Sequence, residues 1–327
     1  MSKVIFAKQI EDILEKIDYL KIGNSVAIKV HFGEKGCTTY LDPELVRKVF
    51  NKMKSLGKKV GLVECNVLYK GSRTTKKEHL ALARKHGFVG MPIDILDGEK
   101  GEEFMEINGC KIGKNIANYD SLVVISHFKG HGATGFGGAI KNVGMGLGSR
   151  AGKLYMHSDL KPYISEKKCR GCKICIENCN AGAISLIKRK ARINEQKCEG
   201  CAMCIAVCPY KATQVPWQGG TPEILQKKVA EYASAVLSLF PNVLFFNILR
   251  KITKQCDCMG TKQKPLMRDV GIIFSDNIVA TDQASLDLVN KHSKGRFERI
   301  NDVDNSNQIR CAEKLKLGEK DYQLITI

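Results

Sequence analysis

Short apolar runs alternate along the chain with segments whose apolar residues recur at helical spacing. Residues 26–30, 60–63 and 121–125 form such runs, and the last is almost wholly apolar, as expected for a strand covered on both faces. Between the first two runs, apolar residues recur with the 3.6-residue period of an amphipathic helix. They are Leu45, Val46, Val49, Phe50 and Met53. Strands that alternate with helices predict an α/β fold with a mainly parallel sheet.

The boundaries of these helices are marked by capping residues. Asp42 stands before Pro43, which places an N-cap residue and a favoured first residue at the start of one helix, and Gly57 ends it. Thr221 and Pro222 open a later helix in the same way. The remaining predicted helices cover residues 77–85, 221–236 and 281–292, and the remaining strands cover residues 93–96, 104–107, 243–248 and 269–274.

The α/β pattern is interrupted by a cysteine-rich segment and then resumes. We therefore predict that residues 1–158 and 219–327 form one discontinuous α/β domain. Residues 161–217 are predicted to form a small inserted ferredoxin-like domain of mixed α and β structure.

The cysteine-rich segment contains two runs with the same spacing, C-x2-C-x2-C-x3-C. This spacing is typical of bacterial ferredoxins, in which each run gives three thiolates to one [4Fe–4S] cluster and the fourth to the other. Zinc ribbons use two C-x2-C pairs, which does not match eight cysteines in two quartets. The predicted ligands are Cys169, Cys172, Cys175 and Cys208 for cluster 1, and Cys198, Cys201, Cys204 and Cys179 for cluster 2.

Composition and charge limit the class of protein. The most apolar run, residues 235–249, is broken by Pro241 and predicts a buried helix and strand, with no membrane span. Lys3 and Lys8 interrupt the N-terminus before a secretory leader can form, and with the many cysteines this predicts a cytoplasmic protein without disulfides. The net charge is +18. Two clusters would lower it to about +14.

The lysines and arginines are spread along the whole chain, without an arginine-rich tract or an aromatic stacking motif. This distribution disfavours nucleic acid and favours an acidic redox partner protein or an anionic small-molecule substrate. The alternative is a lysine-rich solvated surface, which would account for most of the charge.

Residues 126–152 are rich in glycine, with nine glycines between Gly130 and Gly152. The segment matches neither the G-x-G-x-x-G nor the Walker pattern, and the chain has no strong flavin or nicotinamide motif. Two interpretations remain open here. The glycines form either a loop that binds phosphate or carboxylate, or a structural loop that leads into the inserted domain.

Polar residues follow several predicted strands, where ligands bind in open α/β sheets. Because histidine and lysine can bind an anion or donate protons during reduction, five of these residues are candidate catalytic groups. These are His31, His127, Lys129, His131 and Lys141. Other polar residues expected at the same edge or in the adjoining glycine-rich segment are Lys29, Glu64, Cys65, Asn66, Asn142, His157, Cys256, Cys258 and Asp276.

Cys256 and Cys258 form a C-x-C pair that is a second candidate metal site. A disulfide within the pair is not expected, because we place it on extended backbone whose side chains point apart. Its metal ligand set would be completed by Cys37, Cys65 or His131. The alternative is that both are ordinary buried thiols.

These motifs together resemble the domain-of-unknown-function 362 family of iron–sulfur-centre proteins. The resemblance rests on KVHFGE near Lys29, SHFKGHGATGFGGAIKNVGMG from Ser126, the double cysteine motif, CDCMG, and DVGIIFSDNIVATDQASLDL from Asp269. It implies an α/β domain interrupted by a dicluster ferredoxin module, iron–sulfur binding and redox work, without implying a substrate.

The leading hypothesis is an iron–sulfur oxidoreductase of ferredoxin type, in which the inserted module relays electrons to an anionic-substrate or metal site on the α/β domain. A non-catalytic electron carrier or redox subunit that docks to a partner enzyme is one alternative. A metal- or cluster-handling factor that uses the C-x-C pair is another.

Overall fold

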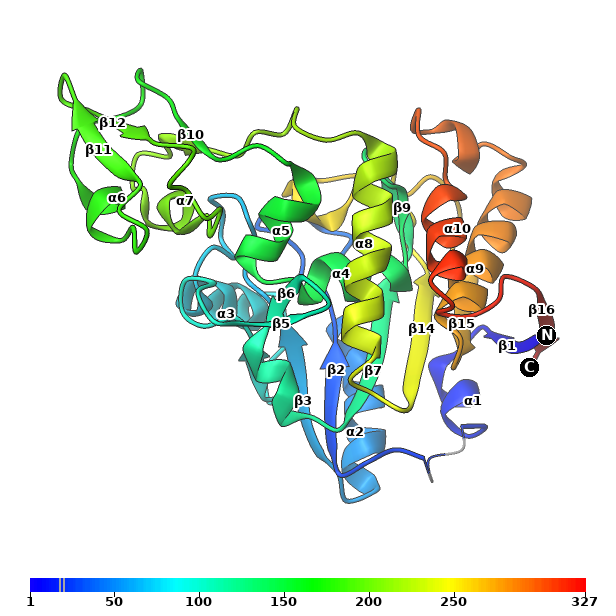
Figure 1. The fold of residues 1–327 in the computed structure, drawn as a ribbon. Helices are drawn as coiled ribbons and strands as arrows, with labels where there is room; N and C mark the ends of the chain where they lie inside the picture. The colour runs from blue at the N-terminus through cyan, green and yellow to red at the C-terminus, as the bar shows by residue number, and fades with distance from the viewer. Residues whose placement is uncertain (18, 20) are drawn as a thin grey trace.

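The structure is a computed structural model and describes residues 1–17, 19 and 21–327. A central sheet of eight strands runs in the order β16-β1-β15-β14-β7-β2-β3-β4 (Figure 1). The strands are β1 (Ser2–Ala7), β2 (Ser25–Lys29), β3 (Lys59–Glu64), β4 (Ile93–Ile95), β7 (Ser121–His127), β14 (Val243–Leu249), β15 (Gly271–Ser275) and β16 (Tyr322–Thr326).

The sheet is mainly parallel, which confirms the predicted α/β fold. β4, β3, β2, β7 and β14 pair in parallel, as do β1 and β16. β15 pairs antiparallel with both β14 and β1. Because β15 runs opposite to β14, its carboxyl end lies beside the amino end of β14. The expectation that Asp276 joins the other polar residues at the carboxyl ends of the parallel strands is therefore wrong.

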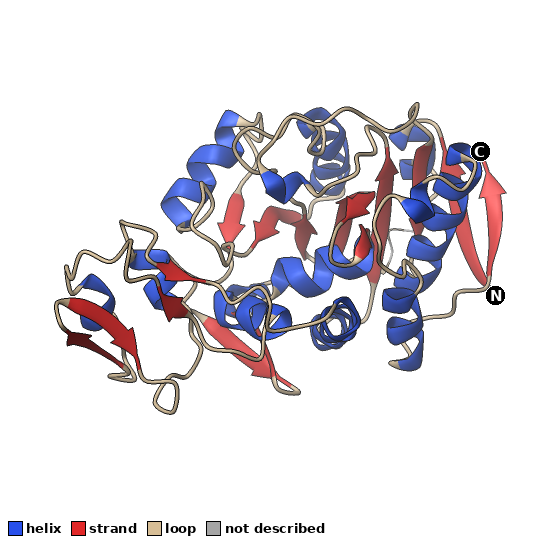
Figure 2. Cartoon of the chain, turned by 90° about the horizontal axis from the view of Figure 1, so that it is seen from above, coloured by secondary structure: helices blue, strands red, loops and turns tan. Residues whose placement is uncertain are grey.

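Helices cover both faces of the sheet, as the view from above shows (Figure 2). Val123 and Ile125 of β7 pack with one set of helices, whereas Leu122 and Val124 pack with the other. Such alternation along a fully buried strand produces two hydrophobic cores. The first face carries α1 (Ile10–Leu14), α2 (Pro43–Ser55) and α3 (Lys76–Lys85), and the second carries α4 (Ala139–Leu147), α8 (Pro222–Leu237), α9 (Ile278–Ser293) and α10 (Asn307–Lys314).

The predicted helix starts are confirmed in atomic detail. The Asp42 side chain accepts a hydrogen bond from the Glu44 amide, 3.0 Å away. The Thr221 hydroxyl accepts one from the Ile224 amide at 3.4 Å. Pro43 and Pro222 begin the helical segments themselves, because their missing amides would have had no intrahelical partner.

The glycine-rich segment is more regular than a loop. It folds into β8 (Lys129–His131), β9 (Gly135–Gly137), α4 and α5 (Arg150–His157). Gly144 lies where α4 crosses α8, and a Cβ atom there would lie 2.1 Å from the Val229 carbonyl oxygen. The expectation of a loop is therefore wrong for this part, and at least one glycine serves the close packing of two helices.

We expect Gly144→Ala to lower the free energy of unfolding by about 1–3 kcal/mol, because the added methyl group overlaps the α8 backbone. Urea unfolding followed by circular dichroism measures this loss. Gly132→Ala is the matched control, since its nearest neighbour is the flexible Gln255 side chain at 3.4 Å. An equal stability for both variants would contradict the packing argument.

Residues 161–217 form a small lobe at one end of the molecule (Figure 1). Among the described residues its strands pair with one another and not with the central sheet. β10 (Tyr163–Ile164) pairs with β13 (Thr213–Gln214), and β11 (Ile184–Ile187) pairs with β12 (Lys190–Ile193). The lobe also contains α6 (Ile174–Glu177) and α7 (Met203–Val207). It has its own hydrophobic cluster, to which Leu68 and Leu154 contribute from outside.

Shorter elements complete the chain. They are β5 (Phe104–Ile107), which pairs with β6 (Cys110–Gly113), and the 3-10 helices η1 (Lys114–Asn118), η2 (Asp257–Met259) and η3 (Phe297–Arg299). None of the helices in the described part of the chain is long and apolar enough to cross a membrane. All fourteen cysteines are free thiols, and eight of them belong to the two predicted quartets.

Candidate functional site

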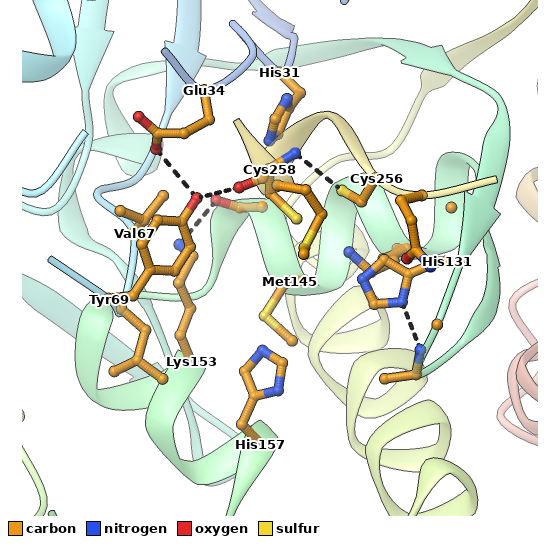
Figure 3. Close-up of a pocket in the computed structure, with 18 of the residues that line it drawn as sticks. His31, Glu34, Val67, Tyr69, His131, Met145, Lys153, His157, Cys256 and Cys258 are labelled. Carbon is orange, nitrogen blue, oxygen red and sulfur yellow. Dashed lines mark hydrogen bonds between the residues drawn. The ribbon is translucent and has the colours of Figure 1, made fainter. Parts of the chain in front are cut away.

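A cavity of about 950 Å³ lies beyond the carboxyl ends of the parallel strands, between the strand-end loops, α4 and α5. Four of the five candidate catalytic residues line it: His31, Lys129, His131 and Lys141. Glu64, Cys65, Asn142, His157, Cys256 and Cys258 also reach the cavity, so residues far apart in the sequence meet there (Figure 3).

His127 is the candidate that the structure places elsewhere. Its Nδ1 lies 2.8 Å from Oδ2 of Asp257, and its Nε2 lies 3.0 Å from the Arg250 carbonyl oxygen. Both nitrogens are occupied, and the ring is not among the groups that line the cavity. The prediction that His127 contacts a ligand is therefore corrected, because its position at the end of β7 directs it toward Asp257.

Asp257 is fully buried between the two cysteines of the C-x-C pair. Burial alone would raise its pKa, but the electrostatic and hydrogen-bond interactions with His127 and Lys129 outweigh burial and lower the pKa to about 2. The Lys129 ammonium lies 3.5 Å from the same carboxylate oxygen. The carboxylate thus fixes the turn that carries the cysteines.

Cys256 and Cys258 lie on a tight turn that continues into η2, with the Cys258 amide 3.4 Å from the Cys256 sulfur. The expectation that their side chains point apart is wrong, because residues two apart on extended backbone face the same side, and here the two sulfur atoms lie within 4.8 Å of each other. The hydrogen bond from the Cys258 thiol holds the pKa of Cys256 well below its usual value despite burial, with help from Lys141 and Lys129. The same bond raises the pKa of Cys258.

His131 completes a group that is able to hold a metal ion. The ligand atoms of His131, Cys256 and Cys258 all lie within 4.8 Å of one another. Of the other two residues proposed to complete the set, Cys37 faces Asp257 and Cys65 faces the Leu147 carbonyl. A soft metal ion is the kind that two thiolates and an imidazole bind.

The orientation of the His131 ring bears on that chemistry. Its Nδ1 accepts hydrogen bonds from the amides of Ala133 and Thr134, both at 3.1 Å. A neutral ring whose Nδ1 is an acceptor carries its proton on Nε2. Metal binding through Nε2 would require loss of that proton, whereas donation of a hydrogen bond to an anion or a thiolate would not.

Three histidines of the cavity are neutral over the physiological range. Burial lowers the pKa of His31 and His131 well below the usual value, and the positive charges of Arg73 and Lys141 respectively add to this effect. Burial and Lys141 lower the pKa of His157 to about 3. These rings can therefore donate or accept hydrogen bonds without carrying charge.

Lys141 provides a free positive charge inside the cavity. Its side chain is half-buried, and within residues 1–17, 19 and 21–327 no hydrogen bond or ion pair engages its ammonium group. It lies close enough to His31, His131, His157 and Cys256 to lower the pKa of each. An anionic group of a ligand is the partner that such an ammonium lacks.

A buried network that the sequence did not reveal forms another wall. Arg73 donates from Nη1 toward His31 Nε2 at 3.0 Å, from Nε to Glu34 at 3.3 Å, and from Nη2 to the Tyr69 hydroxyl at 2.9 Å. The Tyr69 hydroxyl also lies 3.0 Å from the Cys258 carbonyl oxygen (Figure 3). Arg73 and Tyr69 lie on the loop after β3, and only the position of that loop at a strand end could have suggested them.

Lys29 and Glu64 form a buried ion pair below the cavity, with 3.0 Å between Nζ and Oε1. The Lys29 ammonium also donates to Asn142 Oδ1 at 2.7 Å. Burial lowers the pKa of Lys29, and the charge of Glu64 opposes this. Oε2 of Glu64 is buried without a hydrogen-bond partner among the described residues.

The eight cysteines of the small lobe surround two further cavities. One is lined by Cys169, Cys172, Cys175 and Cys208, and the other by Cys179, Cys198, Cys201 and Cys204. The two cysteine loops have the same backbone geometry, since the second and fourth residues after the first cysteine of each run have positive φ. These residues are Gly171 and Lys173 in one loop and Gly200 and Ala202 in the other.

Backbone amides point at several of these sulfur atoms. The Ala183 amide lies 3.3 Å from the Cys179 sulfur, and the Ala212 amide lies 3.2 Å from the Cys208 sulfur. Both donors stand four residues after the last cysteine of their run. Such N–H groups stabilise negative charge on a thiolate and tune iron–sulfur sites.

A profile of the family described as "Domain of unknown function (DUF362)" matches residues 26–287. This chain belongs to the DUF362 family. No curated protein matches the DUF362 chain.

Two solved structures resemble the DUF362 chain weakly. The lactate racemase apoprotein from Thermoanaerobacterium thermosaccharolyticum shares 16% identity with a TM-score of 0.35, over 76% of this chain and 50% of that one. A protein from Thermotoga maritima shares 12% identity with a TM-score of 0.40, over 87% of this chain and 57% of that one. The chain thus spans between 50% and 57% of the length of these two structures.

In the DUF362 chain, one loop connects the small lobe to the large cavity. Leu68 packs into the hydrophobic cluster of the lobe, and Lys70 donates from Nζ to the Ala206 carbonyl oxygen of α7 at 3.0 Å. Tyr69, between them, contacts the carbonyl oxygen of Cys258, which also lines the cavity. Residues 67–73 therefore touch both the cysteine-bearing helix and the cavity.

Proposed function

We propose that the protein is a cytoplasmic iron–sulfur redox protein whose cysteine-rich lobe carries two [4Fe–4S] clusters. In this proposal the lobe passes single electrons to a small anionic ligand in the large cavity. The observation that carries it is the partition of the eight cysteines, because each small cavity is lined by one of the quartets that the spacing predicts.

The residues present fit such clusters. Each cavity offers four thiol sulfur atoms and an apolar lining, which suits a sulfide-containing cluster and suits a hard, hydrated cation poorly. The amide donors at Cys179 and Cys208 would stabilise the negative charge of the ligand sulfurs. When bound, the clusters would supply reversible one-electron chemistry.

The connecting loop supports a relay from the lobe to the cavity. Cys204 lies within α7 and Cys208 directly follows it, so the helix touches both small cavities. Lys70 is hydrogen-bonded to this helix, and its neighbour Tyr69 is hydrogen-bonded to the Cys258 carbonyl. Few residues therefore separate the small cavities from the large one.

The charges in the large cavity support an anionic ligand. Lys141 offers an unpartnered ammonium group, and Lys129 and Arg73 add further positive charge. The neutral His131 ring presents its Nε2–H as a hydrogen-bond donor beside it. A carboxylate or phosphate group would therefore find a charged partner and a neutral donor together.

Anaerobic purification followed by iron and sulfide analysis tests the cluster proposal. We expect about eight iron and eight sulfide per chain and a reduced protein with the electron paramagnetic resonance signals of two interacting clusters. A protein that lacks iron after anaerobic reconstitution, or that holds one zinc ion per group of four cysteines, would refute the proposal.

Replacement of Lys141 tests the ligand class separately. We expect Lys141→Met to weaken the binding of oxalate or phosphate by at least about tenfold, because a hydrogen bond to a charged group contributes about 1.5–3 kcal/mol. Isothermal titration calorimetry measures the dissociation constants. Lys54→Met on the exposed face of α2 is the control, and an equal loss in both variants would refute a role for the cavity.

A second candidate function is metal binding by His131, Cys256 and Cys258, which their 4.8 Å spacing favours. The same elemental analysis distinguishes it, since this site would retain one additional metal ion per chain. Iron near eight with no other metal, before and after addition of zinc, would count against it.

A further inference from the structure

We propose that cluster 1 is the entry point for electrons and that the basic surface around it docks a small acidic one-electron carrier protein. Here cluster 1 is the cluster proposed for Cys169, Cys172, Cys175 and Cys208, so the inference rests on the proposed function.

The cavity of cluster 2 lies against the α/β elements. Asn178, which lines it, accepts a hydrogen bond from Lys100 at 3.3 Å. A Cβ atom on Gly200, within the cluster 2 loop, would lie 3.8 Å from Cδ2 of Leu154 in α5. Electrons that leave cluster 2 are therefore already beside the body of the protein.

The cavity of cluster 1 has no comparable attachment. Within the described part of the chain, no hydrogen bond joins its lining residues to any residue outside 161–217. The hairpin of β11 and β12 lies at the outer end of the lobe, and its Lys190 donates to the Cys169 carbonyl oxygen at 2.7 Å (Figure 1). Cluster 1 thus faces away from the large cavity.

Charge distinguishes the borders of the two cavities. Arg170 and Lys173 line the cavity of cluster 1, whereas among the described residues the charged one that lines the cavity of cluster 2 is Glu199, with Lys161 near its loop at Gly200. The hairpin adds positive charge beside cluster 1, since the Lys190 ammonium binds the Cys169 carbonyl oxygen and the backbone of Arg189 lies against Gly171. We call the set of Lys168, Arg170, Lys173, Lys188, Arg189 and Lys190 the basic rim.

The whole lobe carries an excess of positive charge. Residues 161–217 contain eleven lysines and arginines against four glutamates, a difference of +7. Two clusters would reduce it to about +3. One ligand cysteine is exposed at each cavity, Cys172 for cluster 1 and Cys201 for cluster 2, but Cys172 lies within the basic rim and near Tyr210, which is 47% exposed. An exposed ligand sulfur with an aromatic neighbour and a basic border suits a brief encounter with an acidic redox protein.

The electron balance requires such a donor. Each encounter would oxidise the reduced carrier by one electron and reduce the lobe by one electron, with no proton or leaving group exchanged at the interface. The lobe has two places for electrons, so two encounters would load a pair for the ligand in the large cavity. A nucleic acid would satisfy the positive charge but could not supply electrons.

The test uses the anaerobically purified protein and a reduced acidic two-cluster ferredoxin, mixed in a stopped-flow instrument at several salt concentrations. We expect the triple variant K168E/R170E/K173E to slow the second-order rate more than about tenfold at low salt. The difference should shrink as salt screens the charges. The matched control K54E/K77E/K197E changes the net charge equally at exposed positions away from cluster 1, and its rate should stay within about twofold of the original.

Iron content and the rate of reduction by dithionite separate the two proposals. A rim variant with full iron that dithionite reduces normally, yet that accepts electrons from ferredoxin as fast as the original protein, would overturn the docking inference alone. A protein without iron would overturn the proposed function itself. Displacement of ferredoxin by a short RNA, with the RNA losing affinity in the rim variant, would assign the rim to nucleic acid and likewise refute the inference.

Discussion

Replacing Cys204 by serine is expected to reduce the iron content from about eight to about four atoms per chain and to abolish one of the two cluster signals. The same result is expected for Cys179→Ser, although Cys179 belongs to the other sequence run, because both sulfurs line the same cavity. Iron analysis and electron paramagnetic resonance after anaerobic reconstitution measure both effects.

The prediction is specific because each cavity is lined by three cysteines of one run and the fourth cysteine of the other run. Cys208 lies only four residues after Cys204, yet it lines the cavity of Cys169. Cys208→Ser should therefore remove the signal that Cys169→Ser removes, and should leave the Cys204 cluster in place. Cys311→Ser is the control, since Cys311 lies outside the lobe on α10. If Cys204→Ser and Cys208→Ser removed the same signal, the assignment of ligands would be wrong.

Replacing Lys29 by methionine is expected to cost about 3–5 kcal/mol of stability, because it leaves the buried Glu64 carboxylate without its partner. Lys29 is fully buried at the end of β2, and its ammonium also bonds Asn142 of α4. The loss should appear as a lower urea midpoint with an unchanged slope.

The double variant K29M/E64L distinguishes the lost charge pair from a packing defect. Removal of both charges should restore most of the stability, since a buried ion pair contributes little relative to apolar residues of similar size. If the double variant were as unstable as K29M, the effect would come from packing around Lys29. The ion-pair explanation would then be abandoned.

Much of the fold could be predicted from the sequence, since the relevant signals are local. The caps at Asp42 and Thr221 and the uniform burial of β7 are set by residues within a few positions. The direction of β15 is a different kind of property, because it depends on which strands it lies between in the sheet. No local pattern near Asp276 reports that, and its assignment to the site edge failed for this reason.

The site residues that follow the ends of strands could be predicted from the sequence. Those on long loops could not. His31 and His131 were found because they follow strands of the parallel sheet. Arg73 and Tyr69 were missed because the path of the loop after β3 is set by tertiary contacts with Glu34 and η2. His127 was misassigned because a strand end fixes where a side chain begins, and its hydrogen-bond partner Asp257 fixes where it points.

The loop of residues 67–73 forms part of the cavity wall and also holds the lobe. A ligand that shifts Tyr69 would shift Lys70 as well, and with it the bond to α7. Widening of this side of the cavity would therefore strain the attachment of the lobe. Such an arrangement would let the presence of a ligand be sensed, through a few residues of backbone, at the helix that carries Cys204.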